Sequence, residues 1–214
     1  MTIESAEFVR YYNHTASEYA EKYLHELDNK PLDRYSLQVF ANLVKDNGPV
    51  CDVGCGSGHI AGHLVKYGVN IFGIDLSAGM VNEARRCFPA IDFQVANMFA
   101  LPVSDNHLAG ISAFYAIVHS EPAQIPLLVK EFHRSLKTGG FVLLSFHIGH
   151  QEVIRVNKQA GAEEVFADYV FHNYEHIIGC LEESGFELAE AFIRHPYRNV
   201  EYPSRRAYVR ARKK

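Results

Sequence analysis

Apolar runs of strand length alternate with amphipathic segments through the middle of the chain. The runs are continuous rather than alternating with polar residues, which is typical of strands in a parallel sheet that helices cover on both faces. Five such runs lie at residues 50–53, 71–75, 91–95, 111–115 and 141–146. Helical patterns fall between them, at residues 58–67, 78–87 and 122–136. This order predicts a doubly wound α/β sheet.

The segments at the two ends of the chain extend this sheet. Helical spacing over residues 4–24 and 31–44 predicts an N-terminal helical cap within residues 1–46. Near the C-terminus, strand-like runs at 186–193 and 206–212 follow one another with no helix between them, so they can pair antiparallel. In the second run basic residues alternate with apolar ones, which fits a strand whose basic face meets solvent.

We therefore expect a single domain over residues 1–214. Its fold is predicted as a mostly parallel seven-stranded sheet with an antiparallel C-terminal strand, helices on both faces and the N-terminal helical cap. Residues 148–175 fit no core strand and are predicted to form a lid or a segment of an acceptor pocket.

Composition and charge argue against nucleic acid and membranes as binding partners. The net charge is −4, which provides no general attraction to nucleic acid or to an anionic membrane. No apolar stretch is long enough to cross a bilayer, and acidic residues near the start argue against a secretion signal. Four cysteines without a CxxC pair indicate reduced thiols. We expect a cytoplasmic monomer or homodimer with no membrane partner, and nucleic acid is not an expected partner.

The segment Asp52-Val53-Gly54-Cys55-Gly56-Ser57-Gly58 carries the most specific signal. It joins the first strand run to a helical pattern, and its three glycines allow a sharp turn that a ligand can approach closely. The start of the helix behind it offers unpaired N–H groups to a polar or anionic ligand. The turn predicts a nucleotide-like ligand without deciding which one.

Polar residues at the ends of the next two strand runs narrow the choice. Asp75 ends the second run, where a carboxylate can accept hydrogen bonds from both hydroxyls of a ribose. Asn97 and Met98 follow the third run and offer an amide and a soft apolar face to an adenine. Taken singly, Asp75 could be a surface acid and Asn97 a turn residue. Together at the carboxyl ends of neighbouring strands they predict one site.

With these residues, the chain resembles the class I, Rossmann-like S-adenosylmethionine-dependent methyltransferases, of the type that act on small molecules. The resemblance rests on the glycine turn 52–58, Gly73-Ile74-Asp75-Leu76-Ser77, Ala96-Asn97-Met98 and Leu136-Lys137-Thr138-Gly139-Gly140. It also includes the antiparallel strand pair at the end. A nicotinamide dehydrogenase more usually has GxGxxG, whereas here one residue separates Gly56 from Gly58.

The resemblance implies S-adenosylmethionine as the cofactor, S-adenosylhomocysteine as its product, and a role for each matching residue. Asp52 would brace the turn or reach the ammonium group through water, and Asp75 would hold the ribose. Leu76 would pack on the adenine, with Asn97 and Met98 at its edge; the family often has an acid where this chain has Asn97. The residues implied for the methionine portion are Gly54, Cys55, Gly56 and Gly58.

The N-terminal cap contributes two further candidates. Similar methyltransferases often place a tyrosine and a basic residue near the methionine carboxylate, which implies Tyr19 and Arg34 here. A guanidinium can pair with a carboxylate through two hydrogen bonds. Arg34 fits a solvated helix start equally well.

Candidates for chemistry lie just after the fourth strand run, which the resemblance places beside the transferable methyl group. His119 is the candidate general base because imidazole titrates near neutral pH, although packing against the cofactor is the alternative. Tyr115 is expected to line the methyl group or bind the acceptor. Later histidines are expected to line the acceptor pocket, at His147, His150, His172 and His176. We expect no metal site, because their spacing is not specific for one.

The leading hypothesis is therefore transfer of a methyl group to a small-molecule O, N or C nucleophile by in-line displacement. Two alternatives remain open. One is an RNA or protein methyltransferase that uses the basic C-terminal run. The other is a regulatory subunit that binds S-adenosylmethionine without turnover.

Overall fold

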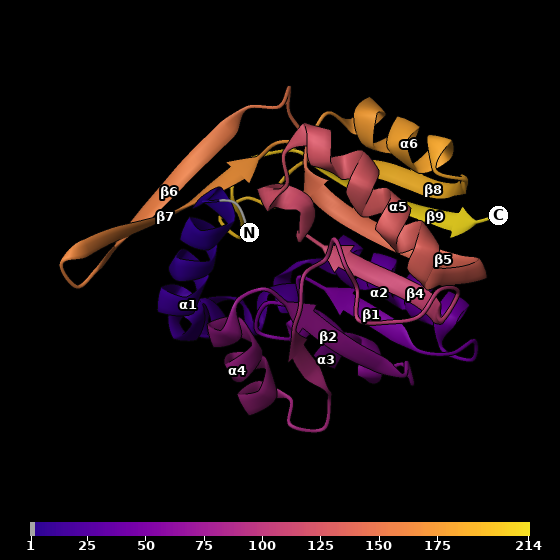
Figure 1. The fold of residues 1–214 in the computed structure, drawn as a ribbon, viewed down its shortest axis with the longest axis horizontal. Coiled ribbons are helices and arrows are strands. Elements are labelled where there is room, and N and C mark those ends of the chain that lie inside the picture. The colour runs from indigo at the N-terminus through magenta and orange to yellow at the C-terminus, as the bar shows by residue number, and fades with distance from the viewer. Residues whose placement is uncertain (1–2) are drawn as a thin grey trace.

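Seven strands form one twisted sheet in the order β3-β2-β1-β4-β5-β9-β8 (Figure 1). The computed structural model describes residues 3–214. All neighbours in this sheet pair in parallel except β9, which is antiparallel to both β5 and β8. The strands are β1 (Val50–Val53), β2 (Ile71–Asp75), β3 (Phe93–Val95), β4 (Leu108–Phe114), β5 (Leu136–His147), β8 (Phe186–Arg194) and β9 (Arg206–Lys213). The predicted sheet, with its antiparallel C-terminal strand, is confirmed.

Helices cover both faces of the sheet, as the continuous apolar strands predict. One buried cluster joins α2 (Pro31–Val44), α3 (His59–Val65) and α4 (Ala78–Cys87) to one face. A second cluster joins α5 (Ile125–Ser135) and α6 (Tyr174–Glu183) to the other. Short 3-10 turns are η1 (Glu26–Asn29), η2 (Ile117–His119) and η3 (Pro122–Gln124). Among residues 3–214, no helix combines the length and apolarity needed to cross a membrane.

The N-terminal helix α1 (Ile3–Tyr23) lies beside the sheet and is fixed to the start of α4. The Asn13 side-chain oxygen accepts hydrogen bonds from Ser77 Oγ and from the Gly79 N–H, both at 2.8 Å. A Cβ on Gly79 would lie 2.9 Å from the Asn13 backbone, so the two helices approach closely. This contact holds α1 over the carboxyl end of β2.

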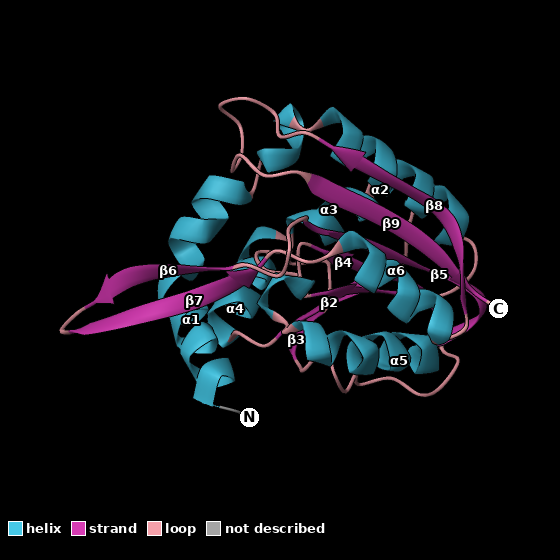
Figure 2. Cartoon of the chain, turned by 90° about the horizontal axis from the view of Figure 1, so that it is seen from above, coloured by secondary structure: helices cyan, strands magenta, loops and turns pink. Residues whose placement is uncertain are grey.

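Residues 153–170 form an antiparallel hairpin outside the main sheet, made of β6 (Val153–Ala160) and β7 (Glu163–Val170). The hairpin projects from the body of the fold alongside α1 in both views (Figures 1 and 2). Ion pairs between Arg10 and Glu163 and between Lys158 and Glu18 join it to that helix. The sequence marked this segment as lying outside the core but did not predict its two strands.

The prediction that the basic residues of the last strand face solvent is wrong. Arg206, Tyr208 and Arg210 are buried, and only Arg212 of the alternating set is exposed. The reason is topological, because β9 lies between β5 and β8 instead of at the sheet edge. Arg206 and Arg210 are compensated there by ion pairs with Glu201 and Glu190.

Candidate functional site

A cavity of about 990 Å³ lies where the parallel strands end, beneath α1 and the hairpin. Ligand sites in open α/β sheets occur at this edge. Eleven of the thirteen residues predicted for the site line the cavity: Tyr19, Asp52, Gly54, Cys55, Gly56, Asp75, Leu76, Asn97, Met98, Tyr115 and His119. Gly58 and Arg34 do not.

The glycine turn is confined between the end of β4 and α1. Gly54 has a φ of 64°, and a Cβ there would lie 2.6 Å from the Cβ of Ala116. Gly56 has a φ of 52°, and its Cβ would lie 3.4 Å from the Tyr19 ring. Backbone in this left-handed region favours glycine. The turn therefore presents bare backbone to the cavity.

Gly58 does not line the cavity; it allows close packing between neighbouring elements. Its φ is 83°, and an added Cβ would lie 2.8 Å from the Phe93 ring and 3.1 Å from Ala84. The glycine thus lets α3 start close to β3 and α4. The predicted contact with the methionine portion is corrected, because Gly58 faces this apolar layer.

We expect Gly58→Ala to destabilise the fold by about 2–4 kcal/mol, from backbone strain plus the collision with Phe93. Gly68→Ala is the matched control. Gly68 has nearly the same φ, 81°, but no atom within 4 Å of its added Cβ, so only the strain of about 1–2 kcal/mol applies. Urea unfolding of both variants measures the difference. Equal losses would show that packing against Phe93 does not require the glycine.

Asp75 faces the cavity with its carboxylate held by backbone. Oδ2 accepts a hydrogen bond from the Gly56 N–H and Oδ1 one from the Ser77 N–H, both at 2.9 Å. Burial raises the pKa of this carboxyl. Each carboxylate oxygen keeps a further acceptor site, so the group can still bind two hydroxyls.

Among the described residues that line the cavity beside the glycine turn, two have a buried polar atom without a partner. These atoms are Oδ2 of Asp52 and Nδ1 of His59. The other oxygen of Asp52 accepts a hydrogen bond from Ser112 Oγ at 2.8 Å, and His59 Nε2 donates to Glu26 Oε1 at 2.9 Å. Since buried polar groups are nearly always hydrogen-bonded, these atoms indicate a polar ligand.

Arg34 lies away from the cavity. Its guanidinium donates to the backbone carbonyl of Leu27 and, at 2.8 Å, to that of Asp28. It therefore braces η1 in front of α2, and its predicted pairing with a carboxylate in the site is corrected. Basic residues that do line the cavity include His59 beside the glycine turn and Lys130 and Arg134 of α5, which the sequence prediction missed.

His119 has both ring nitrogens engaged. Nδ1 lies 2.7 Å from the carbonyl oxygen of Asp168, which only accepts, so Nδ1 carries the hydrogen. Nε2 therefore accepts from the Tyr12 hydroxyl at 2.9 Å, and that hydroxyl accepts from Tyr169 at 2.7 Å. Burial lowers the pKa of His119 to about 4, so the ring is neutral at pH 7.

Tyr12 is a cavity residue that the sequence prediction missed. A signal was present, because Phe8, Tyr12 and Tyr19 have helical spacing and all three line the cavity. The sequence could not show that this stripe of α1 meets η2 and β7. Its partners His119 and Tyr169 lie 107 and 157 residues further along the chain.

Tyr115 has a strained backbone, with a φ of 57°. A bulky residue in the left-handed region costs about 1–3 kcal/mol, and such strain occurs at functional sites. Tyr115 is one of the cavity-lining residues, and its hydroxyl lies 2.8 Å from that of Tyr208, which is not. Its ring lies close to His147, Lys30 and Arg206. The hydroxyl is thus engaged outside the cavity lining and is not free to bind an acceptor.

The adenine-edge candidates also line the cavity. The Asn97 side-chain oxygen accepts from the Phe99 N–H at 2.9 Å, so the residue shapes the turn after β3 as well as facing the cavity. Met98 and Leu76 contribute apolar surface to the cavity lining. An amide whose oxygen is already engaged offers its N–H groups more readily.

The four later histidines do not line the cavity. His172 lies 2.9 Å from the Ile117 carbonyl and His176 lies 3.1 Å from that of Pro122, so both brace the η2–η3 segment. His147 lies 2.7 Å from Ser204 Oγ and stacks on Phe171. The expectation that they line an acceptor pocket is wrong. Within the described residues, no group of three potential ligands that could hold a metal ion is found.

Known proteins share this sequence pattern. Residues 50–140 match the model of a family described as a methyltransferase domain. The demethylmenaquinone methyltransferase of Chlorobaculum parvum is 34% identical over 164 residues, which cover 67% of this chain and 67% of that protein. The chain belongs to the class I S-adenosylmethionine-dependent methyltransferases.

Other relatives of this methyltransferase differ in length. Phosphoethanolamine N-methyltransferase of Triticum aestivum is 32% identical over 155 residues, which cover 67% of this chain but only 28% of the wheat protein. Magnesium protoporphyrin IX methyltransferase from Synechocystis PCC 6803, solved with bound S-adenosylmethionine, has a TM-score of 0.70 at 18% identity. The two chains cover 100% and 99% of one another's length, and this likeness shows the fold.

The residues of the methyltransferase cavity fit its cofactor. The glycine turn leaves bare backbone where side chains would collide, and Asp75 keeps acceptor sites for a ribose diol. The unpartnered atoms of Asp52 and His59 offer an acceptor and a ring nitrogen to the charged amino-acid end. A volume of about 990 Å³ lies at the upper end for ligand sites, which leaves room for a second molecule.

Proposed function

We propose that this protein transfers the methyl group of S-adenosylmethionine to a small-molecule acceptor. The observation that carries the proposal is that one cavity contains both the cofactor-type residues of the sheet edge and an aromatic end beneath α1 and β7. When bound, S-adenosylmethionine supplies a methyl group already activated by the sulfonium. The protein then needs mainly to position the acceptor and to exclude water.

Each end of the cavity suits one part of the cofactor. Asp75 would bind the ribose hydroxyls, and Leu76 and Met98 would enclose the adenine. Asp52 and His59 would bind the ammonium and carboxylate groups at the glycine turn. The unpartnered buried atoms Asp52 Oδ2 and His59 Nδ1 support this assignment of the amino-acid end.

The Asp52 assignment predicts a pH dependence of binding. Burial raises the pKa of Asp52 to about 7. The ammonium group stabilises the ionised carboxylate, so affinity for S-adenosylhomocysteine should rise with pH through 7, by about tenfold between pH 6 and 8. Calorimetric titration measures this. The control ligand, 5′-methylthioadenosine, lacks the amino-acid end and should show no such rise. A rise that persists in Asp52→Asn would assign the titration to another group.

The aromatic end provides a route for the acceptor's proton. Tyr12 and His119 line it, and the hydrogen bond runs from the Tyr12 hydroxyl to His119 Nε2. An acceptor O–H or N–H that donates to the Tyr12 oxygen would pass its proton to Tyr12 as the hydroxyl proton moves to His119. A weak base with a pKa of about 4 suffices when the methylated acceptor is strongly acidic.

Relatives suggest the range of acceptors. By their names, the wheat enzyme acts on an amine of phosphoethanolamine and the Chlorobaculum enzyme on demethylmenaquinone. We infer a small O, N or C nucleophile for this protein. The alternative of an RNA acceptor loses its support, because Arg206 and Arg210 of the basic run are buried and ion-paired.

The test uses S-adenosylmethionine with a labelled methyl group and a cell extract split by ultrafiltration. The proposal expects the label to appear in the low-mass fraction, together with S-adenosylhomocysteine. Heat-inactivated protein is the control. Label only in protein or RNA would overturn the small-molecule assignment, and no transfer to any fraction despite cofactor binding would favour the regulatory alternative.

A further inference from the structure

The aromatic end of the cavity has an apolar lining with little charge. The lining comes from Phe8 and Tyr12 of α1, His119 of η2 and five residues of the hairpin. Among these described residues the charged one is Asp168, whose two oxygens pair with the Arg155 guanidinium at 2.7 and 2.6 Å. His119 is neutral at pH 7, because burial lowers its pKa to about 4. An anionic acceptor would therefore meet a carboxylate at this end and no lining cation.

The cavity does have two cationic lining residues, Lys130 and Arg134, but both lie on α5. Arg134 donates to the Val103 carbonyl at 3.0 Å and pairs with Glu131 at 2.7 Å. This part of α5 thus borders the loop after β3, where the residues implied for the adenine edge lie. Lys130 is one helical turn from Arg134 and shares its face. The two cations belong to the adenine side of the cavity.

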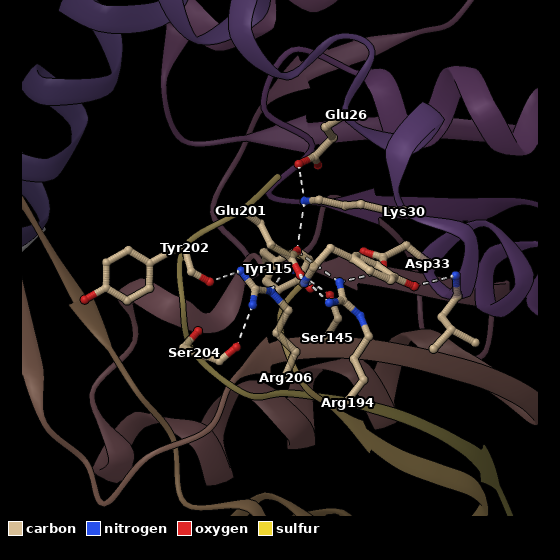
Figure 3. Close-up of polar contacts among 12 residues, drawn as sticks. Glu26, Lys30, Asp33, Tyr115, Ser145, Arg194, Glu201, Tyr202, Ser204 and Arg206 are labelled. Atoms are coloured by element: carbon tan, nitrogen blue, oxygen red, sulfur yellow. Dashed lines mark hydrogen bonds and ion pairs between the residues drawn. The ribbon is translucent and has the colours of Figure 1, made fainter. Parts of the chain in front are cut away.

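Three buried cations outside the cavity lining are already paired with carboxylates. The side chains of Lys30, Arg194 and Arg206 converge on Glu201 (Figure 3). Arg194 Nη2 also lies 2.8 Å from Asp33 Oδ1. None of these five residues lines the cavity. This buried ionic cluster therefore offers no cation to an anionic acceptor.

A hydrogen bond at the aromatic end can receive a polar hydrogen of the acceptor. The Tyr12 hydroxyl donates to His119 Nε2 at 2.9 Å and accepts from Tyr169 at 2.7 Å. A hydroxyl oxygen has two acceptor sites, so that of Tyr12 keeps one for a further donor. Tyr12 and His119 both line the cavity, whereas Tyr169 does not. The end thus combines apolar walls with one acceptor of a hydrogen bond.

The proton path from Tyr12 to His119 suits a hydroxyl acceptor. A hydroxyl oxygen that gains a methyl group becomes strongly acidic, so even a weak base can take its proton. A neutral amine becomes a stable ammonium ion instead and needs no such path. On transfer to oxygen, the electron pair of the broken carbon–sulfur bond stays on sulfur. The hydroxyl proton moves to Tyr12 as the Tyr12 proton moves to His119, which then releases it to water.

We propose that the acceptor is an uncharged, largely apolar molecule and that the protein converts its hydroxyl group to a methyl ether. The inference rests on the proposed function and deepens it, because it requires S-adenosylmethionine in the same cavity. The apolar walls contact the body of the acceptor, and Tyr12 receives its hydroxyl. Carboxylates and phosphates are disfavoured, because burying a charge without a partner is costly.

The first test measures binding of two fluorescent probes to protein saturated with S-adenosylhomocysteine. 2-Naphthol and 2-naphthoate share a ring system and differ in carrying a hydroxyl or a carboxylate. We expect naphthol to bind at least about tenfold more tightly, since the carboxylate lacks a partner. This comparison uses the wild-type protein and does not depend on the folding of a variant.

Tyr12→Phe should weaken naphthol binding about fivefold, the scale of one hydrogen bond. Tyr11→Phe is the matched control, because its ring packs edge-on against Tyr12 at 5.3 Å but does not line the cavity. Its affinity for naphthol should stay within about twofold of the wild type, well under the effect of one hydrogen bond. Naphthol that binds no more tightly than naphthoate, or equal losses in the two variants, would overturn the proposal.

The second test characterises the labelled low-mass product formed in a cell extract. The label should pass into organic solvent at pH 7, survive alkali and leave as volatile methyl iodide in hot hydriodic acid, as the methyl group of an ether does. Label that stays in water, is lost in alkali as from a methyl ester, or resists hydriodic acid as a C-methyl group does would overturn the proposal. Absence of label from the low-mass fraction would instead overturn the proposed function.

Discussion

Asp75→Ala is expected to weaken binding of S-adenosylhomocysteine about 100-fold. Two charge-assisted hydrogen bonds to the ribose, at about 1.5 kcal/mol or more each, account for a loss of this size. The variant also removes the acceptors of the Gly56 and Ser77 N–H groups, which loosens the glycine turn. Isothermal titration of the variant against the wild type measures the effect.

Two further variants make this result specific. Asp75→Asn should also bind weakly, because its NH₂ group would face one of the two backbone N–H donors. Asp46→Ala removes an exposed acid outside the cavity lining and should bind as the wild type does. If Asp75→Ala binds within about threefold of the wild type, well short of the loss of one such hydrogen bond, the ribose assignment is wrong.

Arg194→Met is expected to destabilise the fold by about 3–5 kcal/mol, because it leaves the buried Asp33 without its ion-pair partner and removes one of the cations that contact Glu201. Arg194 is 6% exposed and Asp33 is fully buried, so water cannot replace the lost contacts. Chemical unfolding measures the change. The charge-matched control is Arg86→Met, since Arg86 pairs with Glu83 on the surface of α4 and exposed pairs contribute about 0–1 kcal/mol. A similar small loss in both variants would show that the cluster is not rigid.

The sequence predicted the features that depend on local pattern. Continuous apolar runs indicated the parallel strands, and the polar residues at their carboxyl ends indicated the cavity, because such ends meet at one edge of a sheet. Asp75 and Asn97 illustrate this, since each was placed by its position after a strand. The prediction was weaker where a role depends on distant partners.

Three differences between the sequence predictions and the structure are explained by tertiary packing. Gly58 follows the same motif as Gly54, but its direction toward Phe93 depends on how α3 packs. The alternating Arg206 and Arg210 suggested an exposed face, and only the insertion of β9 between β5 and β8 buries them. Tyr12 and His59 meet their partners through the folding of η1, η2 and the hairpin around the cavity. No local pattern encodes these contacts.

The structure of the protein with S-adenosylhomocysteine bound tests the central claim most directly. The account predicts the ribose hydroxyls on Asp75, the adenine between Leu76 and Met98, and the amino-acid end against Asp52 and His59. A nucleoside bound outside this cavity, or bound in it with the ribose turned away from Asp75, would contradict the account.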